Sequence, residues 1–444
     1  MEMKTLQSNF IRRMFLSLGA GALFGVFAGY LRQHLPADVW QVINNIFFQD
    51  ITTPEGQNTL GLFYIVQTMF TNALKLAIVP LVFFSIILSV CSMSDMRKLG
   101  RIAAKTVGIF VAFYVVACLF GIIASEIAIG AGLYPQFQIA QAAAEVQEVS
   151  TANVLTTLAF AIPDNFIAPL STNSQMLCVV ACAIIIGLCV TVLGEKIKVF
   201  RSFCEDCSEI VQKFIDFVIV KICPFAVFCM IVRTFAVYRA EEVQSILTYM
   251  LIDILVLLIY LFVVYPAAIA VFLRVNPLIF MKKIAKVGII AFGTASSSPA
   301  LPLNIETCTK GLGCSNDVTD FVLPVGMTIN MNGTAITQII GVAFIATSAG
   351  FHVTPAHYLT MTLLAISSSM GAPGVASAGT IMMYAVLTGT GFNTELCTLI
   401  FSMVFALHKP CGMVQTILNV VGDAATTMLV AKSEGEFDQS VYKS

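Results

Sequence analysis

Long apolar segments follow one another through this chain, and they restrict its fold more than any other feature. Runs of about 18 residues or more, the length that spans a bilayer as a helix, extend for example over 14–31 and 60–93. Hydrophobic residues make up 58% of the chain and charged residues only 11%, against roughly 25% charged residues in soluble domains. We therefore predict an all-α polytopic protein of the lipid bilayer and exclude a soluble one.

Positive charges mark every second connection between the apolar segments. The basic clusters fall at 12–13, 97–101, 196–201 and 274–286, whereas the connection over 134–175 contains no Lys or Arg. Because Lys and Arg collect in cytoplasmic loops, the N- and C-termini are predicted to be cytoplasmic, with the protein in the plasma (inner) membrane. No basic patch points to a nucleic-acid partner.

Two apolar segments in the last third are interrupted by serine runs. Segment 287–303 contains Ser296-Ser297-Ser298 followed by prolines, and segment 359–387 contains Ser367-Ser368-Ser369 before Gly371 and Pro373. Non-helical backbone at membrane depth requires cover by protein or water. A linker is the alternative interpretation, but apolar arms flank both runs, so we predict two re-entrant hairpins.

Each predicted hairpin is followed by a span that carries the motif Asn-x-x-Gly and then an oxygen-bearing residue. The first motif begins at Asn330 and ends at Thr334, and the second begins at Asn419 and ends at Asp423. Asn and Gly tolerate left-handed backbone, so both motifs favour unwinding of the helix. Paired interrupted spans in two halves of a chain indicate the midplane site of a transporter.

A polar stripe lies inside the last span. Gln415, Asn419 and Asp423 are spaced four residues apart, so they share one face of a helix. An ionisable side chain in hydrocarbon costs roughly 2.5–3.5 kcal/mol on insertion scales unless it is paired. The stripe therefore predicts a functional site with a cation near Asp423.

At these motifs the chain resembles the dicarboxylate/amino acid:cation symporters, the glutamate transporter family. The resemblance is densest over 291–302, 321–336, 366–379 and 412–434. It implies eight transmembrane helices plus two re-entrant hairpins, arranged as inverted repeats and assembled as a homotrimer. It also implies elevator-like alternating access, in which a transport domain moves against a fixed scaffold.

The resemblance divides the chain into these two parts. The scaffold would comprise 1–101 (spans one and two) and 134–237, an extracellular connection with spans four and five. The transport domain would comprise 102–133 (span three) and 238–432, which carries span six, both hairpins, span seven and span eight. Residues 433–444 would form a cytoplasmic tail.

The resemblance also implies the site residues. The substrate would be held by residues of the first hairpin and of spans seven and eight: Ser296, Ser297, Ser298, Thr334, Gln415, Thr416 and Asn419. One sodium ion would bind Gly326, Asn330, Asn419 and Asp423. A second would bind carbonyls of Thr328, Ser367 and Ser369. Oxygen-only ligation of this kind suits a hard cation such as Na⁺.

The chain departs from the family pattern at the residues that recognise acidic substrates. Gln415 stands where acidic-substrate members have Arg, Ala295 stands at the alternative Arg position, and Gly412 stands where amino-acid transporters have Asp. Without a guanidinium fork, bidentate capture of a second carboxylate is lost. His408 and Lys409 are candidate substitutes, although solvated residues at the start of the span are the alternative interpretation.

A further departure affects the third cation site of the family. Asn332 replaces the acid of the span-seven motif, and Phe110, Phe113 and Tyr114 stand at the span-three positions. Losing the acid and at least one hydroxyl removes most of the ligands for a hard cation. We therefore predict two sodium ions per cycle.

The leading hypothesis is a sodium-coupled symporter of a small carboxylate-bearing solute, an amino acid or organic acid other than glutamate or aspartate. Proton coupling through His408 or Asp423, and a channel-like or non-transporting protein on the same scaffold, are the alternatives. An enzyme is not expected, because no His or Lys is positioned to activate a serine nucleophile. Glu126, Asp253 and Glu306 are either relay residues or partners in interhelical hydrogen bonds.

Overall fold

The computed structural model describes residues 2–52, 56–92, 100–137, 162–171, 175–237, 240–370 and 378–443. These residues form helices joined by short turns, and within them the only β-structure is an isolated antiparallel bridge between Cys314 and Phe437. Six of the described helices are long and apolar enough to cross a membrane. The all-α membrane fold is thus confirmed, while the predicted count of eight spans stays a prediction. The basic segment 97–99 and residues 138–161 of the long connection lie outside the described residues.

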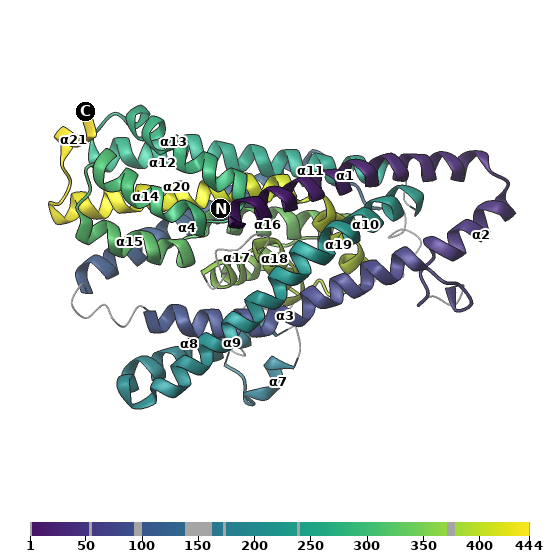
Figure 1. Ribbon diagram of the computed structural model, residues 1–444, viewed down its shortest axis with the longest axis horizontal. Helices are drawn as coiled ribbons and strands as arrows, with labels where there is room; N and C mark the ends of the chain where they lie inside the picture. The colour runs from purple at the N-terminus through teal and green to yellow at the C-terminus, as the bar shows by residue number, and fades with distance from the viewer. Residues whose placement is uncertain are drawn as a thin grey trace.

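One group of helices comes from the first half of the chain. Helix α1 (Glu2–His34) packs along α10 (Cys223–Val237), and α3 (Leu62–Ser92) packs against α8 (Met176–Leu193) and α9 (Lys198–Phe217). In Figure 1, α8 and α9 extend below α3, away from the C-terminal helices. The short helices of this half are α2 (Ala37–Phe47) and α7 (Ile167–Leu170).

A second group surrounds the C-terminal helix α20 (Lys409–Glu434), which is drawn in yellow in Figure 1. Helix α11 (Ala240–Ile259) packs against both α20 and α16 (Asn332–Ser348), and α4 (Gly100–Gly130) lies along α16. A short helix, α12 (Tyr265–Ala268), joins this group. The predicted boundaries of scaffold and transport domain, and any relative movement of the two groups, stay predictions.

The first predicted hairpin has two helical arms and a serine tip. Helix α13 (Pro277–Thr294) begins at a proline that suits the first turn of a helix, after Asn276, whose side chain accepts a hydrogen bond from the Leu278 amide. It ends at Ala295, which has a left-handed φ of 48°. A 3₁₀ turn (Ser298–Ala300) and α14 (Leu301–Glu306) carry the chain back. Arm α13 packs against α20.

The span after this hairpin is broken, as predicted. Helix α15 (Asn316–Ile329) ends before Asn330, and α16 begins at Asn332. The two residues between them have φ values of −95° for Asn330 and −115° for Met331. The break therefore uses backbone of negative φ that is neither helical nor extended, and not the left-handed conformation that Asn and Gly tolerate.

The second hairpin consists of α17 (Pro355–Met370) and α18 (Ala378–Gly389), which pack against each other. Its predicted tip at Gly371 and Pro373 lies outside the described residues. The span that follows divides into α19 (Glu395–Leu407) and α20.

The unwinding predicted within the last span at Asn419–Asp423 is wrong, because α20 is helical from Lys409 to Glu434. The span divides instead at His408, two residues before Pro410, which lacks the amide N–H that would extend the hydrogen-bond ladder. Gly422 serves close packing: a Cβ there would lie 2.3 Å from the Tyr265 hydroxyl. A glycine expected to loosen the helix thus allows α20 to approach α12.

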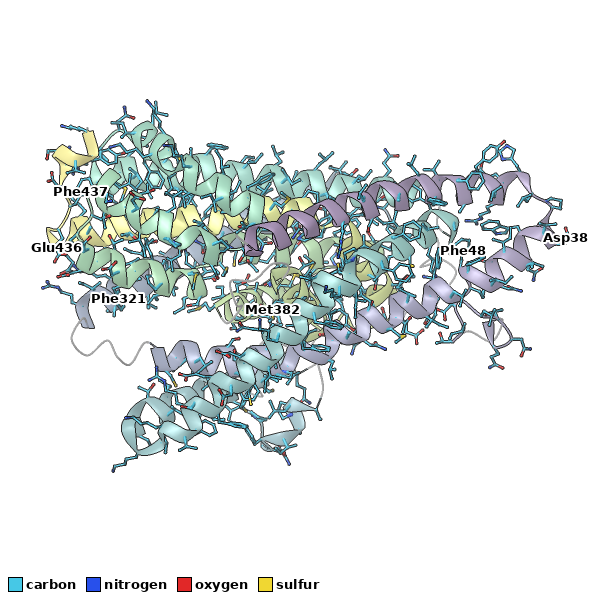
Figure 2. The ribbon with its side chains drawn as sticks, viewed as in Figure 1. Asp38, Phe48, Phe321, Met382, Glu436 and Phe437 are labelled. Carbon is cyan, nitrogen blue, oxygen red and sulfur yellow. The ribbon has the colours of Figure 1, made fainter. Side chains whose placement is uncertain are left out.

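The C-terminal segment folds back onto the second group of helices. Glu434 accepts hydrogen bonds from Arg101 and Lys105 of α4. Helix α21 (Gln439–Lys443) carries the buried Tyr442, whose hydroxyl donates to the Asn276 carbonyl at 2.7 Å. In Figure 2, Glu436 and Phe437 lie at the opposite end of the molecule from Asp38.

Candidate functional site

Asp423 is the carboxylate at the centre of the predicted cation site. Its side chain is 3% exposed, and its Oδ1 accepts a hydrogen bond from Asn330 Nδ2 at 2.8 Å. The same Asn330 amide lies 3.4 Å from the carbonyl oxygen of Asn419. Among the described residues no Lys or Arg forms an ion pair with Asp423, so its buried charge lacks a protein counter-ion.

Gly326 completes this group through its missing side chain. A Cβ at Gly326 would lie 2.4 Å from Asp423 Oδ1, so only glycine allows α15 to approach the carboxylate this closely. The Gly326 carbonyl accepts a hydrogen bond from the backbone N–H of Asn330 at 2.8 Å. The structure therefore brings together Gly326, Asn330, Asn419 and Asp423, the four residues predicted for the first sodium ion.

Aromatic side chains fill the space on the other side of the break in span seven. Tyr114 of α4 is fully buried; its hydroxyl donates to the Ile329 carbonyl at 2.7 Å and accepts from the Met331 amide at 2.8 Å. Asn332, which replaces the acid of the family's third site, donates to Asn330 Oδ1 at 2.8 Å and to the Tyr265 hydroxyl at 3.2 Å. The backbone groups freed by the break are thus bound to a phenol.

Replacing Tyr114 with Phe should destabilise the protein, because the Ile329 carbonyl and the Met331 amide lose their partner while remaining buried. An unsatisfied buried group costs about 1–3 kcal/mol, so the loss should be large enough to lower the midpoint of thermal unfolding in detergent by several degrees. Tyr134→Phe is the matched control, since among the described contacts the buried Tyr134 hydroxyl has no hydrogen-bond partner. Equal midpoints for the two variants would contradict this role of Tyr114.

Thr334, Gln415 and Asn419 form the neutral part of the predicted substrate site. Gln415 Nε2 donates to Thr334 Oγ1 at 2.6 Å, and among the described contacts Gln415 Oε1 has no partner. Asn419 Oδ1 accepts from the Gly333 amide at 2.9 Å, which turns its Nδ2 toward Met331 Sδ at 3.1 Å and Thr334 Oγ1 at 3.4 Å. Because a thioether is a weak acceptor, this amide retains donor capacity for a bound carboxylate.

Gln338 is a site residue that the sequence interpretation missed. It lies on α16 one helical turn after Thr334, and its Oε1 accepts from both Ser368 Oγ and Ser369 Oγ at 3.2 Å. Its Nε2 donates to the Gly379 carbonyl at 3.2 Å. One side chain therefore fastens both arms of the second hairpin to α16. A polar residue four positions after Thr334 in an apolar helix was the signal that could have found it.

Gly412 and His408, at the start of α20, have different surroundings. A Cβ at Gly412 would meet no described atom within 4 Å, so the position of the missing acid is open. His408 lies against α11, with Nδ1 3.3 Å from the Tyr249 hydroxyl. His408 therefore faces α11 rather than the Thr334–Gln415 group, and the structure gives no support to its role as a substitute for the missing Arg.

Several predicted hydroxyls donate to their own helices. Thr416 Oγ1 bonds the Gly412 carbonyl at 2.8 Å, Thr328 Oγ1 the Val325 carbonyl at 3.0 Å, and Ser367 Oγ the Leu363 carbonyl at 2.7 Å. Thr328 lies in the last turn of α15 and Ser367 and Ser369 in the last described turn of α17, and these helices are in contact. Carbonyls at helix C-termini carry partial negative charge, which suits the second predicted cation site. Ser296, Ser297 and Ser298 lie at the tip of the first hairpin, and Ser297 is 5% exposed.

A buried carboxylate beside a broken helix in an apolar helical bundle is the arrangement of an integral membrane transporter rather than an enzyme. The chain belongs to the sodium:dicarboxylate symporter family, which it matches over residues 10–433.

Several relatives match most of the chain. It is 26% identical to a proton/sodium-glutamate symport protein of Bacillus caldotenax, in an alignment that covers 84% of this chain and 88% of that protein. It is 27% identical to a C4-dicarboxylate transport protein of Rhodopseudomonas palustris, in an alignment that covers 96% of this chain and 88% of that protein. It is also 25% identical to a proton/glutamate-aspartate symporter of Escherichia coli, in an alignment that covers 98% of this chain and 95% of that protein.

Proposed function

We propose that this protein is a sodium-coupled secondary active symporter of a small solute with one carboxylate, an amino acid or organic acid other than glutamate or aspartate. One observation carries the proposal: the neutral group of Thr334, Gln415 and Asn419 adjoins the buried Asp423, which has no Lys or Arg ion-pair partner among the described residues. The pocket has lost the charges that would select an acidic substrate, while the cation group remains complete.

Sodium is favoured at Asp423 because backbone carbonyl oxygens lie near its carboxylate, which accepts only a neutral amide N–H from Asn330 among the described contacts. Carbonyls of Gly326 and Asn419 and the carboxylate of Asp423 are hard ligands that suit a hard monovalent cation. A cation there would neutralise a charge that is costly to bury alone. It would also hold the broken backbone at Asn330, which connects the ion to the adjoining substrate site.

Two ions per cycle are favoured over three because Tyr114 and Asn332 occupy the place of a third. The Tyr114 hydroxyl satisfies the two backbone groups at the break, and Asn332 contributes an amide instead of a carboxylate. The uptake rate should therefore rise with sodium concentration with a Hill coefficient no greater than 2, the number of proposed sites.

A single carboxylate is favoured because the described pocket offers amide and hydroxyl donors but no cation. Asn419 Nδ2 and the first-hairpin serines would bind one carboxylate, as neutral hydrogen-bond donors. A second carboxylate at Gln415 would be buried without a counter-charge, at a cost of several kcal/mol. Some relatives are named for glutamate or C4-dicarboxylates, and the neutral side chain of Gln415 is the reason that we propose a different substrate for this chain.

Alternating access would follow from the two groups of helices. We assign α4 and α11–α20 to a moving transport domain and the α1–α3 and α8–α10 group to a fixed scaffold within a homotrimer. Gln338 would fasten the second hairpin over the loaded site, so that closure requires both ligands. Such a requirement makes each ligand raise the affinity of the other, typically by about 5–150-fold.

Uptake into proteoliposomes tests this proposal. Labelled neutral amino acids, monocarboxylates, C4-dicarboxylates, glutamate and aspartate are offered under an inward sodium gradient, an inward proton gradient, or neither. We expect concentrative uptake of a monocarboxylate solute under the sodium gradient, and uptake of glutamate and aspartate at least about 100-fold weaker, the factor that corresponds to roughly 3 kcal/mol. Uptake driven by the proton gradient alone would favour the proton-coupled alternative. Flux that neither saturates nor concentrates the solute would indicate a channel.

A further inference from the structure

A second polar cluster lies in the bundle, outside the groups around Asp423 and Gln415. Asp253 of α11, His408 between α19 and α20, and Cys411 of α20 each offer one donor atom, and these three atoms lie within 4.8 Å of one another. The side chains are 0%, 2% and 0% exposed, respectively. A carboxylate oxygen, an imidazole nitrogen and a thiol sulfur thus meet in a fully buried place.

Helical spacing explains how the cluster forms. Tyr249 and Asp253 are four residues apart on α11, and His408 and Cys411 are three apart at the start of α20, so each pair lies on one face of its helix. Helices α11 and α20 are in contact, and the two faces meet. Thr337 of α16 closes the third side, with Oγ1 donating to Asp253 Oδ1 at 3.0 Å.

The hydrogen bonds within the cluster leave one of its polar atoms without a partner among the described groups. Among the described residues no Lys or Arg forms an ion pair with Asp253. His408 Nδ1 lies 3.3 Å from the Tyr249 hydroxyl, but His408 Nε2 has no hydrogen-bond partner among the described groups. Buried polar groups are normally hydrogen-bonded, so an unsatisfied imidazole nitrogen on a histidine that is grouped with a carboxylate and a thiol indicates an absent ligand.

We propose that Asp253, His408 and Cys411 form a binding site for a divalent transition metal ion of borderline softness, such as Zn²⁺. Oxygen, nitrogen and sulfur donors are the set that zinc accepts in proteins, and three protein ligands leave a fourth position open. Calcium and magnesium select oxygen ligands, so the thiol and the imidazole exclude them. The site is separate from the sodium groups and does not depend on which solute is transported.

The distances are compatible with a single ion. Zinc–ligand bonds of about 2.0–2.3 Å place the ligand atoms of a tetrahedral site roughly 3.3–3.8 Å apart. The three donor atoms lie within 4.8 Å of one another, so each pair would have to approach by no more than about 1.5 Å. Tyr249 is a positioning residue: its hydroxyl accepts the N–H of the second ring nitrogen of His408, as partners of metal-bound imidazoles do.

A shared proton is the competing occupant of this cluster. A proton between Asp253 and His408 would satisfy both, and Cys411 would then remain a thiol that donates to the Met250 carbonyl at 3.8 Å. A metal ion uses all three groups together. Whether binding requires the Cys411 thiolate therefore distinguishes a metal ion from a shared proton.

A bound ion would connect α11 to the first turn of α20, the turn that carries Gly412 and leads to Gln415. Both helices belong to the proposed transport domain, so the ion would stabilise this domain without linking it to the scaffold. Binding to the folded state alone should raise the thermal midpoint with increasing metal concentration.

Cobalt titration of the purified full-length protein tests the proposal. After removal of metal by a chelator, Co²⁺ is added in detergent, and its near-ultraviolet thiolate charge-transfer band is recorded while bound metal is counted by mass spectrometry. We expect one cobalt-binding site per chain, and added Zn²⁺ should displace the cobalt and remove the band. Cys411→Ser should abolish the band, and Tyr249→Phe should raise the dissociation constant about 10–100-fold, as loss of an outer partner does.

Cys397→Ser is the matched control, because the chain has thirteen cysteines and Cys397 is equally buried, on α19. It should keep the band and the affinity of the wild type. The proposal is overturned by binding that does not saturate at one ion per chain, or by an identical band in Cys411→Ser. If Cys411→Ser does not fold, Asp253→Asn replaces it, and unchanged cobalt affinity in that variant has the same meaning. Because the readout is metal binding, its failure leaves the proposed symport untouched.

Discussion

Uptake by an Asp423→Asn variant should no longer depend on sodium. Asparagine keeps an oxygen that accepts from Asn330 Nδ2, now 2.8 Å from Asp423 Oδ1, so the packing at Gly326 survives while the charge is lost. The remaining ligands are neutral oxygens, which hold a cation weakly at a buried position. In the wild type, sodium should raise solute affinity by about 5–150-fold, and in the variant this factor should fall close to one. Solute affinity measured by isothermal titration calorimetry, with and without sodium, checks this.

Asp423→Ala should give the same loss of coupling, with an additional loss of stability because Asn330 then lacks its acceptor. Asp320→Asn is the matched control: it makes the same charge change on α15, which also carries Gly326, at an exposed residue outside the cation group. Its sodium dependence should equal that of the wild type. A wild-type sodium dependence in Asp423→Asn would refute the assignment of the first cation site to this carboxylate.

Local sequence patterns predicted much of the fold. Apolar segments of bilayer length form the long helices, because such segments cannot satisfy their backbone in lipid otherwise. The serine and proline run after Thr294 predicted the first hairpin, since prolines there cannot continue a helix. The Asn330 motif likewise predicted the break between α15 and α16, although the backbone there has negative φ rather than a left-handed conformation.

The parts that the sequence could not predict depend on contacts between distant segments. The motif at Asn419 has the same Asn-x-x-Gly pattern as the one at Asn330, yet it stays helical. At Gly422 the missing side chain accommodates the Tyr265 hydroxyl, a neighbour that no local pattern reveals. The break at Asn330, in turn, is supported by Tyr114 from another helix. Packing decides which of two similar motifs unwinds.

The same distinction applies to the candidate site. Gly326, Asn330, Asn419 and Asp423 were predicted as a set by resemblance, and the structure brings them together. Gln338 was missed because its role depends on hairpin residues that contact it only in the folded chain. His408 was considered as a substitute for the missing charged residues, but the division of the span at this residue places it against α11.

Substituting Gln415 by Arg together with Gly412 by Asp should convert the pocket to one that accepts acidic amino acids. Gly412 has open space for a side chain, with no described atom within 4 Å of its Cβ position. The new carboxylate would bind a substrate ammonium, and the guanidinium would bind a side-chain carboxylate in the bidentate geometry that Arg alone provides. A hydrogen bond to a charged group contributes about 1.5–3 kcal/mol, so aspartate or glutamate affinity should rise roughly 10–150-fold over the wild type.

Competition of unlabelled aspartate and glutamate against the wild-type solute measures this change in the proteoliposome assay. Gln415→Lys with Gly412→Asp is the matched control, because it adds the same charge without the fork and should give a smaller gain. Gln415→Met removes the bond to Thr334 without adding charge, and it should leave acidic amino acids excluded. If the Arg variant folds and still transports the original solute with an unchanged substrate profile, Gln415 does not contact the solute. The charge of the pocket would then be set elsewhere on the surface that the second hairpin covers.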